Sequence, residues 1–511
     1  MRQVDMTNRF EMVAKTFKGL EDVLAEELRD LGAINVEPGR RMVSFEGDLA
    51  ILYKANMCCR TALRILKPFY KFTANDPEEL YEKIKEYDWN KLLSLSKTFS
   101  IDTVANSDEF THSRFVTYRV KDGIVDFFKD KFGPDKRPGV RLHDADVKIN
   151  VHISGENVTL SLDSSGESLH KRGYRVSQTD APINEVLAAG IILKSGWRGD
   201  CPFVDPMCGS GTFLIEAAMI GAGINPGVYR KKFAFEDWPD FDAELFDEIY
   251  NDDSGERELK YTIYGADISP KAVSIAQKNI KQAGVARFID LQVKPLSSWD
   301  SAPENGILIT NPPYGERIGS DDMEGLYRMI GTKLKHVFTG YHAWIIGYKE
   351  EYFNKIGLAP SLKERLFNGS LDCELREYVI FKGEYNEFRR HGGRLKQREE
   401  DAVLKNGKSR HFDRTDKQKD RLRKEIDARF RLHSKKEERH PGSSKRSFDE
   451  NFLDKKKERR DSRENKSAAQ IANEHYIRQL ERFGPKQPSI RDDKAMNEEG
   501  RIMRLRKGWK K

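Results

Sequence analysis

Residues 203–216 of the 511-residue chain read FVDPMCGSGTFLIE, an apolar stretch followed by a glycine-rich turn and a helix-like stretch. In this turn Gly209 and Gly211 stand one residue apart, and the absence of side chains there lets the backbone approach a ligand closely. The first turn of a helix offers unpaired N–H groups and the positive end of a dipole, which suit a carboxylate or a phosphate. The stretch therefore predicts a strand, a turn and a helix that form a binding site, although a plain strand–turn–helix also fits it.

Two common nucleotide-binding motifs do not match this stretch. It lacks the GxxxxGK[ST] pattern, which excludes a P-loop ATPase. The GxGxxG pattern of dehydrogenases fits poorly, because Phe213 and Leu214 fill the region of the third glycine.

Strand-like and helix-like stretches alternate around this turn, from residue 183 to about residue 385. The expected strands are 203–205, 261–268, 288–293, 306–310, 342–347 and 377–381, and the expected helices are 212–222, 270–283 and 326–338. Such alternation is typical of an α/β fold with a doubly wound, largely parallel sheet.

The chain before residue 166 has a mixed pattern. Strands are expected at 9–17, 41–47 and 98–104, a hairpin at 147–153 and 158–163, and helices at 19–28 and 113–130. Residues 166–182 look like a linker.

A second candidate site residue is Asp267, at the end of the strand expected over 261–268. A carboxylate accepts several hydrogen bonds and can bind both hydroxyls of a ribose. A lone Asp at this place more often caps the next helix. Here Ser269 and Pro270 supply the cap and the first helical residue, which leaves Asp267 for a ligand.

The third candidate is the sequence NPPY at residues 311–314, directly after an apolar strand. Two prolines remove backbone donors and leave carbonyl acceptors. The Asn311 side chain and a proline carbonyl can both accept from one planar amino group, and Tyr314 can stack on a base. A generic proline-rich loop is the alternative interpretation.

In this order and at these separations, the three motifs resemble the Rossmann-like class I methyltransferases that use S-adenosylmethionine. NPPY resembles the motif of the branch that acts on exocyclic amino nitrogens of nucleic-acid bases. Residues 8–165 resemble the ferredoxin-like plus THUMP module of RNA-modifying enzymes. The stretches LHKRGYR at 169–175 and APINEVLA at 181–188 are close to the pattern of the bacterial large-subunit (23S) rRNA guanine-N2 methyltransferases of the K/L type.

The resemblance implies roles for individual residues. The implied S-adenosylmethionine-binding residues are Asp205, Cys208, Gly209, Gly211, Asp267, Ile268 and Asn311, and the implied catalytic residues are Asn311, Pro312, Pro313 and Tyr314. Where the family has an acidic contact to adenine, this chain has Pro295, so Gln292, Ser297 or a backbone carbonyl would have to replace it. Cys208 is expected to be a small packing residue and not a nucleophile.

The implied reaction is methylation of the N2 amine of a guanine in 23S rRNA. Asn311 and the carbonyl of Pro312 would accept the amine hydrogens, and Tyr314 would stack on a flipped-out base. Three alternatives remain open: a THUMP-type tRNA guanine-N2 methyltransferase, a non-catalytic RNA-binding or ribosome assembly factor on the same fold, and a DNA adenine methyltransferase. The last leaves the N-terminal module unexplained.

RNA is the expected partner. The helix at 113–130 carries Arg114, Tyr118, Arg119 and Lys121, a mixture that suits RNA or a plain solvated face. In the linker, Lys171, Arg172 and Arg175 can either pack at the domain junction or contact RNA. Residues 223–258, with Trp238, are expected to be an insertion near the substrate cleft or a cap on the fold.

Charge is unevenly distributed along the chain. The net charge is +7 overall, but residues 391–511 hold 37 Lys plus Arg against 22 Asp plus Glu, and the rest of the chain is therefore acidic. This distribution excludes a uniformly basic nucleic-acid binder. Leu, Ile, Val and Phe make up only 18 of those 121 residues, so the tail is expected to be disordered, with 417–432 and 468–483 as possible helices. It either tethers RNA or aids solubility.

Several protein classes are not expected. No stretch of 18 apolar residues and no signal peptide is visible. Five cysteines without a CxxC pair argue against disulfides or zinc and fit the cytoplasm, and no histidine cluster suggests a metal. The expected domains are ferredoxin-like 1–65, THUMP 66–165, linker 166–182, methyltransferase 183–386 and a basic low-complexity tail 387–511.

Overall fold

The computed structural model describes residues 9–179, 182–313, 320–369, 371–381 and 383. The chain divides into two units, Met1–Asn406 and Gly407–Lys511, and all described residues belong to the first. The basic tail and the helices expected at 417–432 and 468–483 lie outside the described residues.

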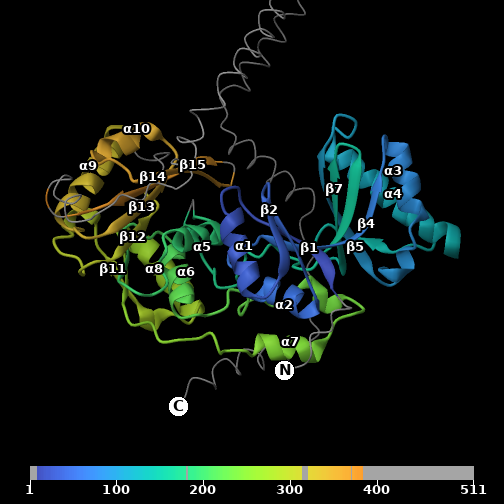
Figure 1. Cartoon of the computed structure of the whole chain (residues 1–511), viewed down its shortest axis with the longest axis horizontal. Helices are drawn as coiled ribbons and strands as arrows, with labels where there is room; N and C mark the ends of the chain where they lie inside the picture. Colours follow the sequence, from blue (N-terminus) through green and yellow to red (C-terminus); the bar gives the residue numbers. More distant parts are fainter. Residues whose placement is uncertain (1–8, 180–181, 314–319, 370, 382, 384–511) are drawn as a thin grey trace, which may run out of the picture. The chain divides into compact units, whose positions relative to one another are not determined.

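The N-terminal module, residues 9–165, contains an eight-stranded mixed sheet (Figure 1) with the strand order β2-β3-β1-β4-β8-β7-β5-β6. Its strands are β1 (Phe10–Lys15), β2 (Ile34–Gly39), β3 (Met42–Gly47), β4 (Arg64–Thr73), β5 (Thr98–Asn106), β6 (Gly139–Val140), β7 (Val147–Ser154) and β8 (Asn157–Asp163). Its helices are α1 (Glu21–Asp30), α2 (Leu49–Cys58), α3 (Pro77–Glu86), η1 (Trp89–Lys91) and α4 (Ser113–Phe132). The strands and helices expected here from the sequence are therefore present.

Local sequence signals explain why these helices form and how they pack. Leu24 and Leu28 of α1 are fully buried and lie one turn apart, so one face of the helix enters the core. The Asp48 side chain caps α2 by accepting from the Ile51 N–H at 3.0 Å. Asp76 caps α3 in the same way.

The second half of the described chain, from residue 185 on, contains a seven-stranded sheet in the order β11-β10-β9-β12-β13-β15-β14. Neighbours from β11 to β13 pair in parallel, and β13, β15 and β14 pair antiparallel, which confirms the largely parallel sheet. The strands are β9 (Phe203–Asp205), β10 (Ile263–Asp267), β11 (Ile289–Val293), β12 (Ile307–Thr310), β13 (His342–Gly347), β14 (Leu362–Asn368) and β15 (Leu371–Val379). The helices are α5 (Glu185–Lys194), α6 (Thr212–Gly221), α8 (Pro270–Gln282), η3 (Ala286–Phe288), η4 (Leu296–Ser298), α9 (Ser320–His336), α10 (Glu350–Phe353) and η5 (Asn354–Ile356).

Successive residues of the central strands enter hydrophobic cores on opposite faces of this sheet. Phe203 of β9 packs in a core with residues of α5, α6 and α8, whereas Val204 packs in a core with residues of α9 and α10. On β12, Ile307 enters the first core and Leu308 the second. Side chains of a strand alternate in direction, so apolar residues at every position give a sheet covered by helices on both faces.

Several elements in this half of the chain differ from the sequence-based expectation. Helices α5 and α7 (Ala243–Tyr250) and strand β14 were not predicted, α9 begins at Ser320 and not at 326, and β15 begins at Leu371 and not at 377. Strand β14 lies at the edge of the sheet, and its Lys363 and Arg365 side chains are exposed. Because of these charged residues, the sequence does not show the apolar pattern of a buried strand.

Residues 223–258, expected to be an insertion near the substrate cleft or a cap on the fold, pack against the N-terminal module. The segment contains η2 (Ala234–Asp237) and α7 (Ala243–Tyr250). Phe235 stacks on Tyr53 of α2 with ring centroids 4.5 Å apart, and Trp238 is 6% exposed within the core of that module. The Gly227 N–H donates to the Met57 carbonyl at 2.9 Å. These aromatic residues thus belong to the hydrophobic core of the N-terminal module.

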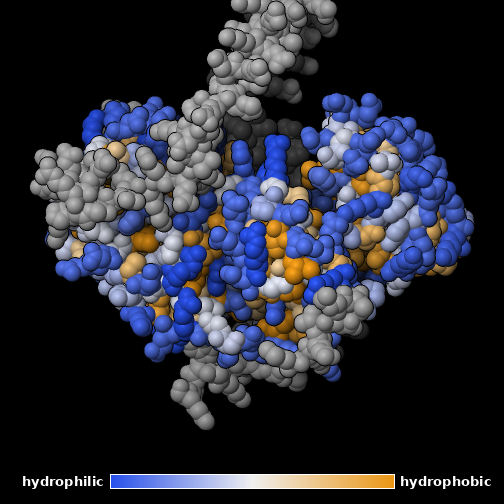
Figure 2. Space-filling view, in the orientation of Figure 1, coloured by the Kyte–Doolittle hydropathy of each residue, from blue (hydrophilic) through white to orange (hydrophobic). Residues whose placement is uncertain are grey.

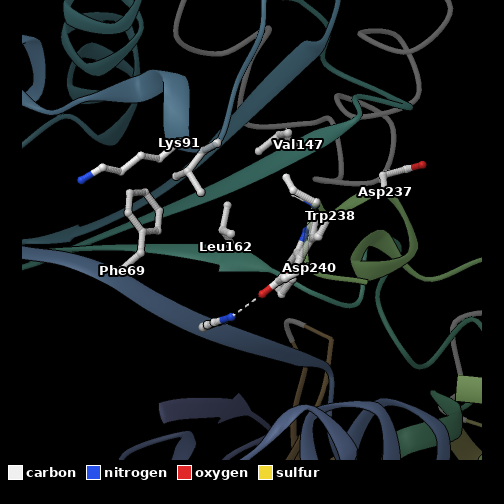
Figure 3. Close-up of a pocket in the computed structure, with 10 residues that line it drawn as sticks. Phe69, Lys91, Val147, Leu162, Asp237, Trp238 and Asp240 are labelled. Atoms are coloured by element: carbon white, nitrogen blue, oxygen red, sulfur yellow. Dashed lines mark hydrogen bonds and ion pairs between the residues drawn. The ribbon is translucent and has the colours of Figure 1, made fainter. Parts of the chain in front are cut away.

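A cavity of about 270 Å³ lies beside this segment. It is lined by Lys67, Phe69, Lys91, Leu92, Val147, Leu162, Asp237, Trp238, Pro239 and Asp240, and Figure 3 shows Leu162 between Phe69 and Trp238. Lys67 forms an ion pair with Asp240 at 3.1 Å across it. None of the lining residues belongs to the motifs at 203–216, 264–268 or 311–314. Within the part of the chain that the structure describes, no helix is long and apolar enough to cross a membrane.

Candidate active site at the carboxyl edge of the parallel sheet

The glycine turn, residues 206–211, leads from β9 into α6. Gly209 and Gly211 have φ angles of +53° and +83°, in the left-handed region that favours glycine. A Cβ atom on Gly211 would lie 3.1 Å from the Cβ of Ala276 on α8, so the turn also needs a glycine for close packing. Gly211 is the N-terminal cap residue of α6. Because it has no side chain, the N–H groups in the first turn of the helix receive no hydrogen bond from a capping side chain.

Asp205 ends β9 inside the protein, with 1% of its surface exposed. Its Oδ1 accepts from the Thr310 hydroxyl at 2.8 Å and from the Met207 N–H at 3.2 Å. Burial raises the pKa of this carboxyl to about 7, and the negative charge of Asp267 adds to the effect. A bound cationic group, such as an ammonium, would stabilise the ionised form.

Asp267 ends β10 and makes two hydrogen bonds to the backbone. Its Oδ2 accepts from the Gly209 N–H at 3.0 Å and its Oδ1 from the Ser269 N–H at 2.9 Å. Ser269 caps α8 as predicted, with its hydroxyl accepting from the Ala272 N–H at 3.3 Å. Asp267 thus also has partners of its own in the backbone. Each carboxylate oxygen retains a further lone pair that can accept a ligand hydroxyl.

Asn311 follows β12 and presents an unused acceptor. Its Oδ1 is buried and has no hydrogen-bond partner among the described residues. Pro312 is buried and Pro313 is exposed, whereas Tyr314 lies outside the described residues. Buried polar atoms are nearly always hydrogen-bonded, so an unsatisfied one marks a position where a donor from a ligand would be stabilised.

The sheet topology brings these three side chains together. Asp267 and Asp205 are the last residues of β10 and β9, and Asn311 directly follows β12; these three strands are consecutive neighbours in the sheet. Parallel strands place their carboxyl ends at one edge, and the chain reverses its direction of winding between β9 and β12. Ligands of open α/β sheets bind at such a point. The motifs predicted from the sequence therefore meet at one site.

Comparison with known families covers the same three parts of the chain. Residues 172–377 match the model described as the RMKL-like methyltransferase domain, residues 11–66 the RlmL ferredoxin-like domain, and residues 74–163 the THUMP domain.

A candidate RNA methyltransferase of Synechocystis sp. is 36% identical over 371 residues, which are 72% of this chain and 96% of that protein. The chain belongs to the RMKL-like methyltransferase family. The ribosomal RNA large subunit methyltransferase K/L of Syntrophotalea carbinolica is 39% identical over 71% of this chain, and the match spans 52% of that longer protein. The crystal structure of SMU.472, a candidate methyltransferase complexed with SAH (S-adenosylhomocysteine), superposes with a TM-score of 0.65 at 33% identity, covering 74% of this chain and 100% of that one.

In this RMKL-like chain, the segment expected to be a linker is packed against the methyltransferase domain. Arg172 is buried, lies 3.4 Å from the Glu216 carboxylate of α6 and donates to the Arg60 carbonyl at 2.5 Å. The Tyr174 hydroxyl donates to Glu216 at 2.9 Å. Lys171 is exposed and pairs with Glu167. Of the two interpretations of the basic linker residues, packing therefore accounts for Arg172, and Lys171 remains accessible.

Two further residues of the RMKL-like domain were not predicted for the site. Arg175 and Asn279 both contact the glycine turn through Ser210. The sequence indicates Arg175 only as a basic linker residue, and Asn279 lies in a helical stretch, AQKNIKQ, whose composition is typical of a solvated surface. No local signal identifies either, because their partners are distant in sequence.

The residues near the expected adenine contact are also defined. The Pro295 carbonyl accepts from the Ser298 N–H at 3.0 Å, and the Gln292 side chain donates to Asp290 at 3.0 Å.

Burial raises the pKa of the Cys208 thiol well above its usual range, which supports packing and not nucleophilic chemistry. Among the described residues, no group of three or more His, Cys, Asp or Glu side chains could hold a metal ion.

Proposed function

We propose that this chain methylates the N2 amine of a guanine in large-subunit ribosomal RNA, using S-adenosylmethionine. The observation that carries the proposal is the buried, unpartnered Oδ1 of Asn311, which follows the strand adjacent to that of Asp205. The match to K/L enzymes supports the substrate, although the chain spans only about half of those relatives.

The described residues fit the cofactor. Asp205 is a buried carboxyl group whose ionised form the ammonium of the methionine part would stabilise. Gly209 has no side chain, so the backbone of the turn can lie close to the cofactor. Asp267 retains lone pairs for ribose hydroxyls. Ile268 is 73% exposed and Val293 54% exposed, and Val293 pairs with Asp267 in register, so an apolar surface suited to an adenine ring lies beside the ribose site.

When bound, S-adenosylmethionine would supply an electrophilic methyl group on a positively charged sulfur. The guanine nitrogen would bond to this methyl as the methyl–sulfur bond breaks and S-adenosylhomocysteine leaves, and the amine would then lose a proton to water. Asn311 accepts one amine hydrogen, which orients the nitrogen and stabilises the positive charge that develops on it. The carbonyl of Pro312 accepts the second hydrogen. Holding the amine in one orientation removes much of the entropic barrier of a bimolecular reaction.

RNA binding would fall mainly to the THUMP part of the N-terminal module. On the face shown in Figure 2, hydrophilic residues predominate over α3 and α4. Against this background α4 exposes Phe115 (51%) and Tyr118 (49%), and the Arg114 guanidinium lies 6.0 Å from the Tyr118 ring. Exposed aromatic and basic groups of this kind stack on unpaired bases. Arg119 instead binds Glu78, at 2.6 Å.

The basic tail and the cellular location complete the proposal. With 37 basic against 22 acidic residues, the segment 391–511 would add nonspecific affinity for RNA by displacing counterions. The described cysteines, Cys58, Cys59, Cys201, Cys208 and Cys373, are all free thiols, which suits the cytoplasm where ribosomal RNA is modified.

The decisive experiment maps modified guanines by mass spectrometry in ribosomal and transfer RNA from a strain lacking this protein. We expect one N2-methylguanine to disappear from 23S rRNA and to return when purified protein and S-adenosylmethionine are added to the extracted RNA. Loss of the modification from tRNA alone would identify the tRNA enzyme instead. Unchanged guanines in both RNAs would contradict methylation and favour a non-catalytic role.

A further inference from the structure

Asn279 lies inside the methyltransferase domain, on the side of α8 that faces the glycine turn. Its side chain is fully buried and its amide uses all of its hydrogen-bonding capacity. The oxygen accepts from the N–H groups of Val176 and Ser177, at 3.0 and 3.2 Å. The nitrogen donates to the carbonyls of Ser177 and Ser210, at 2.8 and 3.1 Å. One amide thus joins α8, the segment after Tyr174, and the glycine turn.

Arg175 approaches the same turn from the preceding segment. Its guanidinium donates to the hydroxyls of Ser210 and Thr212, both at 2.9 Å, and to the Glu185 carboxylate at 2.6 Å. Because guanidinium is planar, these three bonds fix the relative positions of the turn, the first residue of α6 and the beginning of α5. None of the hydrogen bonds named here for Asn279 and Arg175 involves Asp205, Asp267 or Asn311.

The two side chains restrain Ser210, which lies between the two glycines of the turn. Gly209 and Gly211 both adopt left-handed conformations and flank Ser210, and glycines lose more conformational freedom on folding than other residues. Ser210 is held on its carbonyl by Asn279 and on its hydroxyl by Arg175. A turn that is already ordered before the ligand arrives loses less entropy on binding.

We propose that Asn279 and Arg175 are positioning residues that hold the glycine turn in its cofactor-binding conformation. The inference rests on the proposed function, because it assumes that this turn binds S-adenosylmethionine. It predicts that their loss weakens cofactor binding more than it slows the methyl transfer of the fully loaded enzyme.

The test uses two conservative variants and two matched controls in the full-length protein. Asn279→Asp keeps the shape but replaces two N–H donors by a carboxylate that faces two carbonyls, and Arg175→Lys loses the fork of donors. Asn56→Asp alters another buried amide, on α2, which donates to the Leu52 carbonyl and the Ser164 hydroxyl, both at 2.9 Å. Arg257→Lys alters an arginine that donates to the Gly221 carbonyl at the far end of α6, at 2.8 Å.

Calorimetric titration with S-adenosylhomocysteine gives Kd for each variant, thermal unfolding gives Tm, and RNA methylation gives kcat and KM. We expect Asn279→Asp and Arg175→Lys to raise Kd and the KM for S-adenosylmethionine about tenfold, as loss of one or two buried hydrogen bonds would. At saturating cofactor kcat should remain near the wild-type value. Both controls should lower Tm to a similar extent and leave Kd unchanged.

Three results would overturn the positioning role. If Asn279→Asp and Arg175→Lys lower Tm but bind S-adenosylhomocysteine like the wild type, the two residues are structural only. If the controls weaken binding equally, the effect is general destabilisation. If the wild-type protein itself does not bind S-adenosylhomocysteine, the proposed function fails and the positioning role fails with it. In the first two outcomes the wild type binds, so the positioning role alone is overturned.

Discussion

The two sheets of this protein organise their polar groups in different ways. In the methyltransferase domain, parallel strands between two cores direct Asp205, Asp267 and Asn311 to one edge. In the N-terminal module, most strands pair antiparallel, and the aromatic and basic candidates for RNA binding lie on the exposed face of α4. In the proposed function, the chemistry that needs fixed geometry is concentrated at one site, whereas RNA recognition would be spread over a surface. Substitutions should cause large losses in the first region and graded losses in the second.

The largest effect is expected for Asn311→Ala. Removing the acceptor of the amine hydrogen should lower kcat for RNA methylation roughly 100-fold or more, as loss of one preorganised polar contact does in other active sites. Tm should change little, because the Asn311 Oδ1 has no partner among the described residues. Binding of S-adenosylhomocysteine should persist, because the proposed partner of this oxygen is the target amine. Single-turnover methylation and calorimetry measure the two quantities. Asn90→Ala, in an exposed position of η1, serves as the control, and undiminished turnover of Asn311→Ala would contradict its role.

The second prediction concerns Asp205 and pH. Its raised pKa of about 7 means that the carboxyl is protonated below neutrality and cannot pair with an ammonium. Affinity for S-adenosylhomocysteine should therefore fall by up to about tenfold per pH unit below pH 7. Asp205→Asn should bind weakly at every pH and show no such slope. A wild-type Kd that is independent of pH between 6 and 8 would contradict the pairing.

Asp205 should affect the stability of the ligand-free protein in the opposite direction. Because its pKa is higher in the folded state than the unfolded value of about 3.9, folding favours the protonated form, and this group lowers stability as pH rises from about 4 through 7. Ligand-free Asp205→Asn should accordingly unfold at a higher temperature than the wild type at pH 8. Differential scanning fluorimetry at pH 6 and pH 8 measures the difference. If Asp205→Asn instead has a lower Tm than the wild type at pH 8, the hydrogen bonds of Asp205 contribute more to stability than the burial of its charge costs.

A smaller effect is expected on the N-terminal surface. Changing Phe115 and Tyr118 together to Ala should weaken RNA binding about tenfold, the loss expected when aromatic stacking on bases is removed. Cofactor affinity should stay the same. Phe132→Ala removes an aromatic residue that is 44% exposed at the other end of α4 and provides the matched control. An equal loss of RNA affinity in Phe132→Ala would mean that the effect is not specific to the part of α4 that carries Phe115 and Tyr118.

The smallest and most salt-dependent effect is expected for deletion of residues 391–511. If the tail binds RNA, its removal should lower affinity about threefold at physiological salt and reduce the slope of log Kd against log salt concentration. If it serves only solubility, neither quantity should change. Fluorescence anisotropy with an rRNA fragment at several salt concentrations distinguishes the two outcomes.

Sequence alone identified the elements whose signals are local. Glycines one residue apart after a short apolar strand, and NPPY after another, predicted where Gly209, Gly211 and Asn311 would lie relative to the sheet. It did not identify Asn279 or Arg175, because the Asn279 partners Val176 and Ser210 are far away in the chain. Asp267 was placed correctly at the end of β10, but its bond to the Gly209 N–H depends on how two strands align. Sequence alone also did not show that aromatic side chains of residues 223–258 pack against α2, which is distant in the chain.

The packing of that aromatic segment limits how such proteins can be recombined. Phe233, Phe235 and Phe246 are encoded within the methyltransferase half of the chain, yet they fill the core of the N-terminal half. A gene fragment that begins at the methyltransferase half would expose them to water, and an N-terminal fragment that ends before residue 223 would have a gap where they belong. Each half therefore needs the other to complete the hydrophobic core of the N-terminal half. A chimera between relatives should exchange residues 223–258 together with the N-terminal half.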